Sequence, residues 1–197
     1  MGLVISVAKV GEPAEFDLEC RKRGLDWITN NPGKLTEPRD FWSPFRTHLR
    51  NGFNGLCGYA AMLCPTGGTV DHFISVRNDP TLIYEWGNYR YASGTMNGIK
   101  RNKDAKVLDP YLVPEGWFEI ILPSLQMKVT SSVPASDRDK AEYMLDEMRL
   151  GDDERIIEWR QSYYELYQRG ELTLDGLRRV APLIAEAVER QLAVPHS

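Results

Sequence analysis

Two short runs with strand character and the start of a helix follow one another between residues 69 and 101. Residues 69–76 alternate in polarity, as a half-buried strand does. Residues 81–92 are rich in tyrosine and tryptophan, which favours β-structure or an aromatic-lined loop. Residues 93–101 open on Ser93, a residue that caps helix N-termini well. The sequence therefore predicts a strand, a loop, a second strand and a short helix in that order.

Other parts of the chain carry weaker local patterns. We expect a helix over residues 13–23 with Gly24 as its stop, and another opened by Ser43-Pro44. Residues 117–122 and 125–130 are strand-like runs that a Pro-Ser pair joins, which predicts a hairpin.

The last third of the chain has apolar residues at helical spacing. Three such stripes follow from about residue 136, the second ended by Gly170 and the third kinked or split by Pro182. We interpret these stripes as core or subunit contacts. The expected fold class is α+β, with residues 1–135 as one domain and 136–197 as a helical region that associates with a partner or with itself.

Five polar residues in the central segment are candidates for chemistry. Cleaving a phosphodiester needs a base for water, which a neutral histidine supplies near pH 7. It also benefits from a hard cation, whose preferred ligands are carboxylate and amide oxygens. Such residues stand in the predicted strands and helix, in the order Asp71, His72, Asn88, Asn97 and Lys100.

This ordered set resembles the HNH endonuclease motif in its Asp-His…Asn…Asn-x-x-Lys form. The resemblance implies a ββα-metal core over roughly residues 55–105. It implies that His72 is the general base, that Asn88 tethers the loop and orients the histidine, and that Lys100 lies near a phosphate. It further implies one Mg²⁺ or Mn²⁺ ion on Asp71 and Asn97. Arg90 and Arg101 are further phosphate candidates on charge and proximity.

A downstream flank of the motif is Val107-Leu108-Asp109-Pro110, followed by Gly116-Trp117-Phe118. It resembles the continuation in a bacterial subgroup found in anti-phage systems with an ATPase partner, such as Septu-type systems and some retrons. Many HNH proteins hold a structural zinc with two Cys-x-x-Cys pairs. Here Cys57 stands alone, with Ala60, Ser93 and Met96 at the other three positions. We therefore expect no zinc.

The net charge is −4, which argues mildly against a protein that grips long DNA unaided. We expect DNA as substrate, a larger protein partner such as an ATPase, or self-association, and a cytoplasmic location without a membrane partner. Two alternatives stay open. One is an inactive HNH-derived binding or scaffold subunit, and the other is a toxin-like nuclease under the control of an inhibitor.

Overall fold

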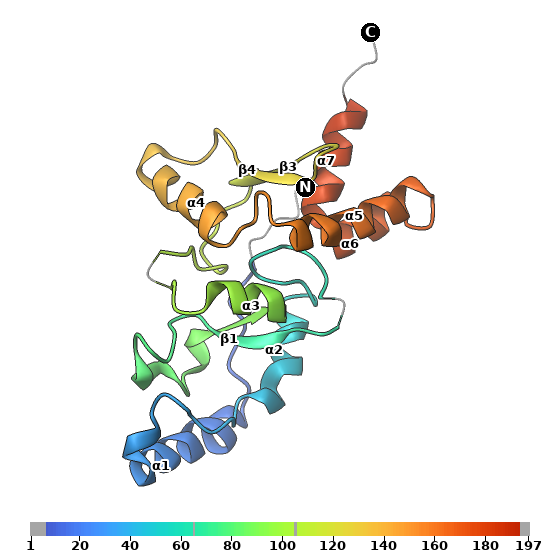
Figure 1. The fold of residues 1–197 in the computed structure, drawn as a ribbon. Coiled ribbons are helices and arrows are strands. Elements are labelled where there is room, and N and C mark those ends of the chain that lie inside the picture. The colour runs from blue at the N-terminus through green and yellow to red at the C-terminus, as the bar shows by residue number, and fades with distance from the viewer. Residues whose placement is uncertain (1–6, 65, 105, 194–197) are drawn as a thin grey trace. The chain divides into compact units, whose positions relative to one another are not determined.

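The computed structural model describes residues 7–64, 66–104 and 106–193 (Figure 1). Within these residues, seven α-helices accompany two small antiparallel sheets, so the predicted α+β class is confirmed at that level. None of the helices in the described ranges is both long and apolar enough to cross a bilayer. The chain divides into two compact units, which are described in turn.

The first unit contains the described parts of residues 8–58 and 64–105. It starts with a π-helical segment, Asp17–Lys22, that continues as helix α1 (Arg23–Asn30). The prediction that this helix stops at Gly24 is wrong. Gly24 lies inside helix α1. A Cβ at this position would lie only 2.3 Å from the Tyr84 ring, so a larger residue does not fit. Close packing, and not helix termination, accounts for the glycine.

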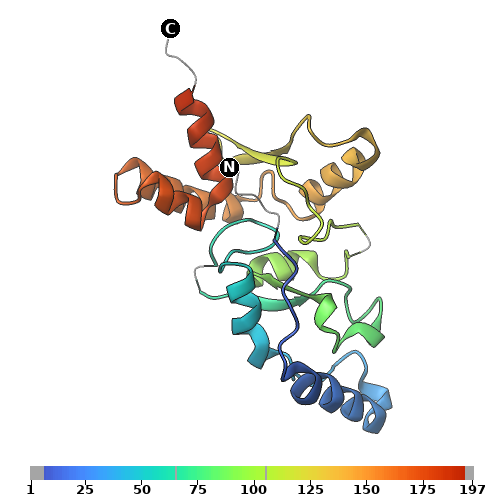
Figure 2. The same cartoon turned by 180° about the vertical axis from the view of Figure 1, so that it is seen from behind.

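Helix α2 (Arg46–Gly52) follows a 3₁₀ turn at Ser43–Phe45, close to the predicted helix start. The extended segment before the first helix runs past α2 (Figure 2). A Cβ on Gly52 would meet the Val10 side chain at 2.3 Å, and Val10 O accepts a hydrogen bond from Trp86 Nε1. The segment is thereby held against the unit's aromatic core.

The predicted strand–loop–strand–helix order is present in this unit. Strand β1 (Thr69–His72) pairs antiparallel with β2 (Tyr89–Ala92). Helix α3 (Gly94–Lys100) follows β2 directly, and its N-cap is Ser93, whose Oγ accepts from Met96 N–H at 3.2 Å. The predicted cap is therefore confirmed.

The second unit consists mainly of the described residues in 59–63 and 106–197. It contains the predicted hairpin, formed by β3 (Phe118–Ile121) and β4 (Gln126–Val129). The chain passes from the first unit to the second near residue 105, and the domain boundary expected at residue 135 stays a prediction. The hairpin associates with the C-terminal helices through two arginines, because Arg160 donates to Leu125 O and Arg190 donates to Ile120 O.

Four helices complete this unit, in agreement with the predicted helical tail. They are α4 (Ala135–Glu147), α5 (Glu154–Gln168), α6 (Leu174–Val180) and α7 (Pro182–Ala193). Gly170 follows α5 with φ of +71°, a conformation that glycine adopts without strain. Pro182 begins α7, so the proline splits the third predicted stripe into two helices.

Candidate active site

The β1–β2 hairpin positions the candidate residues by its register. Asp71 pairs with Arg90, and His72 pairs with Tyr89 at the last position of β1. Gly68 stands directly before β1, where a Cβ would meet the Tyr91 ring at 2.5 Å. Its N–H donates to Tyr91 Oη at 2.7 Å. This contact fixes the start of β1 against β2.

His72 lies half-buried in an aromatic environment. Its ring packs edge-on against Trp42 and Tyr89, with centroid distances of 4.7 and 5.1 Å. Because side chains alternate along a strand, Asp71 and His72 face different surroundings even though they are neighbours. The aromatic rings restrict the imidazole to one orientation.

A backbone carbonyl determines which nitrogen of His72 carries a proton. His72 Nε2 lies 2.9 Å from Ile83 O, and a carbonyl oxygen only accepts hydrogen bonds. Tyr89 Oη donates to the same oxygen at 2.7 Å. Burial lowers the pKa of His72 below its usual value of 6.5, against the opposing effects of Ile83 O and Asp71. The ring is therefore neutral near pH 7, with Nε2 protonated and a lone pair on Nδ1.

Asn88 holds the loop that supplies this carbonyl. Its Oδ1 accepts from Ile74 N–H at 2.7 Å, and its Nδ2 donates to Ile74 O at 2.9 Å and to Leu82 O at 3.1 Å. Leu82 precedes Ile83, the partner of His72. Asn88 thus joins both ends of the loop between the strands, and its contacts support the position of the imidazole.

Asp71 forms an ion pair in the interior of this unit. Lys100 Nζ lies 3.0 Å from Asp71 Oδ1, and the two side chains are 0% and 2% exposed. Lys100 Nζ also donates to His72 O at 2.8 Å. The last turn of α3 is thereby fixed to the end of β1.

Asn97 comes from the same face of α3, one turn before Lys100. Its Nδ2 donates to Thr69 Oγ1 at 3.1 Å and to Val70 O at 3.5 Å. The structure therefore brings Asn97 and Lys100 to the strand that bears Asp71 and His72. Because Nδ2 is the donor in these contacts, Oδ1 is the amide atom with which Asn97 could serve a cation.

The three predicted phosphate contacts differ in their surroundings. Lys100 is fully buried, and Arg90 is 4% exposed with Nη1 donating to Gly87 O and Tyr89 O. Both side chains are engaged in these contacts inside the unit, and their predicted approach to a phosphate stays a prediction. Arg101 is exposed and remains a candidate.

Sequence reasoning missed the groups that orient His72. Trp42 stands 30 positions before the histidine in a segment without a motif, and the partner at Ile83 is a backbone oxygen. Tyr89 follows Asn88 directly and could have been identified from the strand pairing alone. The other two become neighbours of His72 only through the tertiary fold.

The cysteines of this unit, Cys20, Cys57 and Cys64, are buried in its interior. Cys57 Sγ accepts from Ser93 N–H at 3.3 Å, next to the N-cap of α3. A hydrogen bond with Cys57, together with burial, raises the pKa of the Cys64 thiol. The Cys64 thiol is thus protonated, and Cys57 packs beside the helix that carries Asn97.

No protein-family model matches the sequence, and a search of the curated proteins finds no match. The function is therefore argued from the residues and their geometry.

Proposed function

We propose that this chain is a metal-dependent endonuclease of the HNH type that hydrolyses phosphodiester bonds in DNA. The observation that carries the proposal is the environment of His72. A half-buried, neutral imidazole has Nε2 engaged by Ile83 O at 2.9 Å, which leaves Nδ1 as its basic atom. The same strand bears Asp71, and Asn97 of α3 donates to Thr69 at its start, which supports the proposal.

The residues of the chain have separate tasks in this reaction. His72 Nδ1 takes a proton from water, and the resulting hydroxide attacks phosphorus as the bond to the 3′-oxygen breaks. Trp42 and Tyr89 keep the ring in place, while Asn88 fixes the loop that carries Ile83. The 3′-oxygen leaves with the electron pair of the broken bond and takes a proton from solvent, so the products have a 5′-phosphate and a 3′-hydroxyl.

The residues fit a single hard cation by the chemistry of their donor atoms. Asp71 offers a carboxylate, and Asn97 offers Oδ1 because its Nδ2 is engaged with Thr69. Asp71 would hold Mg²⁺ or Mn²⁺ next to the Lys100 ammonium. When bound, the ion supplies charge stabilisation at the phosphate and at the leaving oxygen.

The buried Asp71–Lys100 pair also favours a second candidate, an HNH-derived module that binds or scaffolds without cutting. An ion pair with both side chains at 2% exposure or less is a sufficient structural reason for an aspartate. In this alternative Asp71 serves only to anchor α3 to β1.

Plasmid cleavage in the presence of Mg²⁺ separates the two candidates. We expect wild type to nick or linearise the plasmid, and His72→Ala and Asn97→Ala each to lose at least about a hundredfold in rate. His48→Ala is the matched control, since His48 is exposed and contacts Gly11 O at 3.0 Å instead of the candidate site. A folded wild type that leaves plasmid, linear duplex and single strands intact supports the scaffold alternative.

We further propose that the nuclease acts in bacterial anti-phage defence together with a larger protein, such as an ATPase. The support is the resemblance of the flanking segments and the acidic net charge of −4. Size measurement of the chain alone and after co-expression with a candidate ATPase tests this. A monodisperse monomer that cuts DNA at full rate unaided contradicts it.

A further inference from the structure

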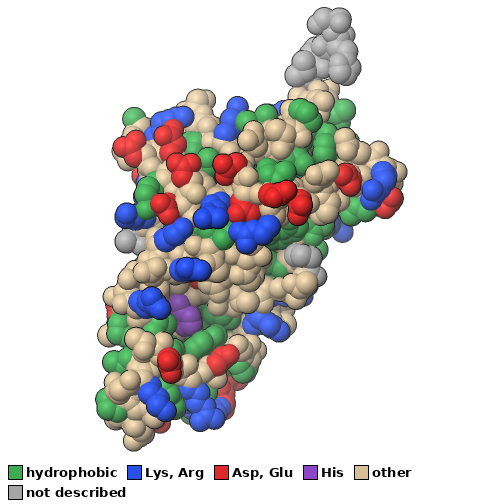
Figure 3. All heavy atoms as spheres, viewed as in Figure 1, with side chains coloured by type: hydrophobic (Ala, Val, Ile, Leu, Met, Phe, Trp, Pro, Cys, Tyr) green, Lys and Arg blue, Asp and Glu red, His purple; other side chains and the backbone are tan. Residues whose placement is uncertain are grey.

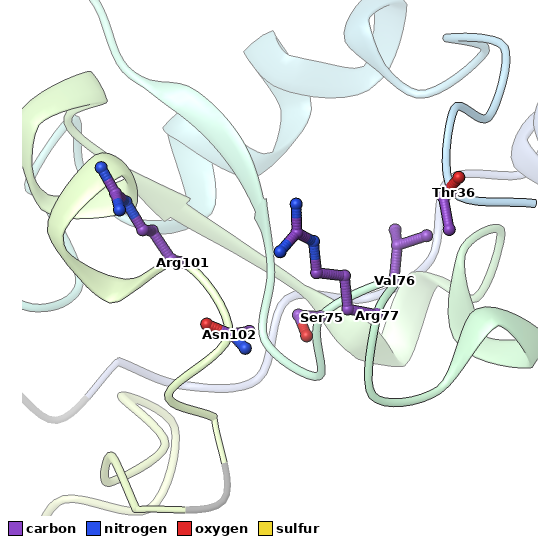
Figure 4. Close-up of a pocket in the computed structure, with 6 residues that line it drawn as sticks. All are labelled: Thr36, Ser75, Val76, Arg77, Arg101 and Asn102. Carbon is purple, nitrogen blue, oxygen red and sulfur yellow. The ribbon is translucent and has the colours of Figure 1, made fainter.

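An open cavity of about 440 Å³ lies in the first unit, lined in part by the segments that follow β1 and α3 in the chain. Its lining comes from the loop after β1, from the segment after α3 and from Thr36. In Figure 4 the Arg77 and Arg101 side chains extend towards the same edge of the view. The lining residues are Thr36, Ser75, Val76, Arg77, Arg101 and Asn102.

The charge of this cavity is positive. Within the described ranges the Arg77 guanidinium has no ion pair or hydrogen bond, and Arg101 contacts only Gly98 O, at 3.2 Å from Nε. The nearby carboxylate of Asp104 is 5% exposed, and both its oxygens accept from Asn78 Nδ2 at 2.9 Å. Figure 3 shows Lys and Arg side chains spread over this face of the molecule, with Asp and Glu among them.

The two sides of the cavity are connected by Asn78. Asn78 N–H donates to Ser75 O at 2.9 Å, and Nδ2 donates to Asn102 O at 3.1 Å. Arg101 itself has a φ of +49°, an uncommon value for a residue with a side chain. Asn78 therefore joins the loop that carries Arg77 to the segment after α3 that starts with Arg101.

Each side of the cavity follows a residue of the candidate site in the chain. Arg77 follows His72 by five positions, and Arg101 follows Lys100 directly. When a nucleic-acid strand places one phosphate at His72, the neighbouring phosphates of the same strand lie at regular distances on either side. Guanidinium groups bind such oxygens with paired hydrogen bonds, and the Ser75 hydroxyl and Asn102 amide can donate as well.

We propose that the cavity between Arg77 and Arg101 binds a backbone phosphate of the substrate strand, next to the phosphate that is cut. The inference rests on the proposed nuclease function and deepens it by assigning a non-reacting subsite. The bound group is a phosphodiester within a strand, and a free phosphate or mononucleotide is the other source of the same chemistry.

Binding is measured without cleavage, by anisotropy of a labelled oligonucleotide in EDTA at several salt concentrations. We expect Arg77→Gln and Arg101→Gln each to weaken binding roughly three- to tenfold and to reduce the slope of log K against log salt by about one. Arg179→Gln is the control for net charge, because Arg179 is exposed on α6 of the other unit. Equal weakening by all three variants overturns the assignment.

A second arm locates the phosphate. Oligonucleotides with one uncharged methylphosphonate linkage are compared, position by position around the cut. One flanking position should weaken wild type and have no further effect on the Arg77→Gln/Arg101→Gln variant. An equal effect on both proteins at every position overturns the subsite. Displacement of the oligonucleotide by inorganic phosphate or a mononucleotide at low millimolar concentration overturns the strand as the source.

Plasmid cleavage by wild type is recorded in parallel, so that the two proposals fail separately. Cleavage that depends on His72, with oligonucleotide binding insensitive to both arginines, leaves the nuclease function standing and removes the subsite. A wild-type protein that neither binds nor cleaves nucleic acid overturns both.

Discussion

Lys100 Nζ and Asp71 Oδ1 lie 3.0 Å apart in the protein interior, with the two side chains 0% and 2% exposed. The pair joins the last turn of α3 to β1, and Lys100 Nζ also donates a hydrogen bond to the backbone oxygen of His72. An ammonium thus already accompanies the carboxylate that we propose as a metal ligand. Asp71 therefore contributes both to the stability of the candidate site and to its proposed ability to bind a cation.

Removal of the Lys100 ammonium should destabilise the fold strongly. Lys100→Met leaves a buried carboxylate without its cation, so we expect the free energy of unfolding to fall by about 3–5 kcal/mol. Asp71→Asn/Lys100→Met should lose less than Lys100→Met, because no buried charge is then left unpaired. Urea unfolding of the three proteins measures this.

Magnesium gives the same variants a second readout. If Asp71 holds a cation, Mg²⁺ should raise the melting temperature of Lys100→Met more than that of the double variant, since binding to the native state stabilises it. Equal shifts in the two proteins would count against Asp71 as a ligand.

The protonation of His72 should make stability fall in mild acid. Burial depresses its pKa below 6.5, so the unfolded chain binds the proton more readily than the native protein. The contribution of neutral His72 is fully present above about pH 6.5. It is lost progressively as the pH falls from that value towards the depressed native pKa.

Urea unfolding of wild type and His72→Gln between pH 7.5 and pH 5 isolates this effect. The stability difference between the two proteins should shift against wild type as the pH falls. A difference that stays constant over the whole range contradicts a buried neutral imidazole. The rate of DNA cleavage should also fall as His72 becomes protonated, because only the neutral ring accepts a proton from water.

Asn88 should be a positioning residue whose loss affects both stability and turnover. Asn88→Ala removes three hydrogen bonds to Ile74 and Leu82, at about 1 kcal/mol each. Asn88→Asp keeps the acceptor for Ile74 N–H but places a carboxylate against two carbonyl oxygens, so we expect it to be no better than alanine.

The readout specific to positioning is the separation of kcat from KM. We expect Asn88→Ala to lower kcat with little change in KM, because the loop presents Ile83 O to His72 and does not contact substrate in this proposal. A variant with full kcat and a lower melting temperature would show that Asn88 is structural only.

Gly24 and Gly98 offer a matched pair of glycine substitutions within helices. Gly24→Ala places a Cβ 2.3 Å from the Tyr84 ring, and we expect a loss of about 1–3 kcal/mol from overpacking. Gly98→Ala in α3 meets nothing within 4 Å, and we expect a gain of about 0.5–1 kcal/mol from helix propensity. Thermal unfolding compares them, and equal changes would contradict the packing explanation for Gly24.

Local sequence patterns were sufficient to predict the secondary-structure elements of the candidate site. Alternating polarity predicted β1, Ser93 predicted the start of α3, and Pro182 predicted the break between α6 and α7. These features depend on backbone geometry and capping within a few residues, which the local sequence specifies. The order of Asp71, His72, Asn88 and Asn97 was likewise sufficient to suggest their chemistry.

The surroundings of each candidate residue follow from the tertiary fold. Lys100 is a buried partner of Asp71, Ile83 contributes a carbonyl to His72, and Gly24 packs against Tyr84. The β3–β4 hairpin joins the C-terminal helices through Arg160 and Arg190. Burial and long-range hydrogen bonds arise from segments far apart in the chain, so no local pattern encodes them.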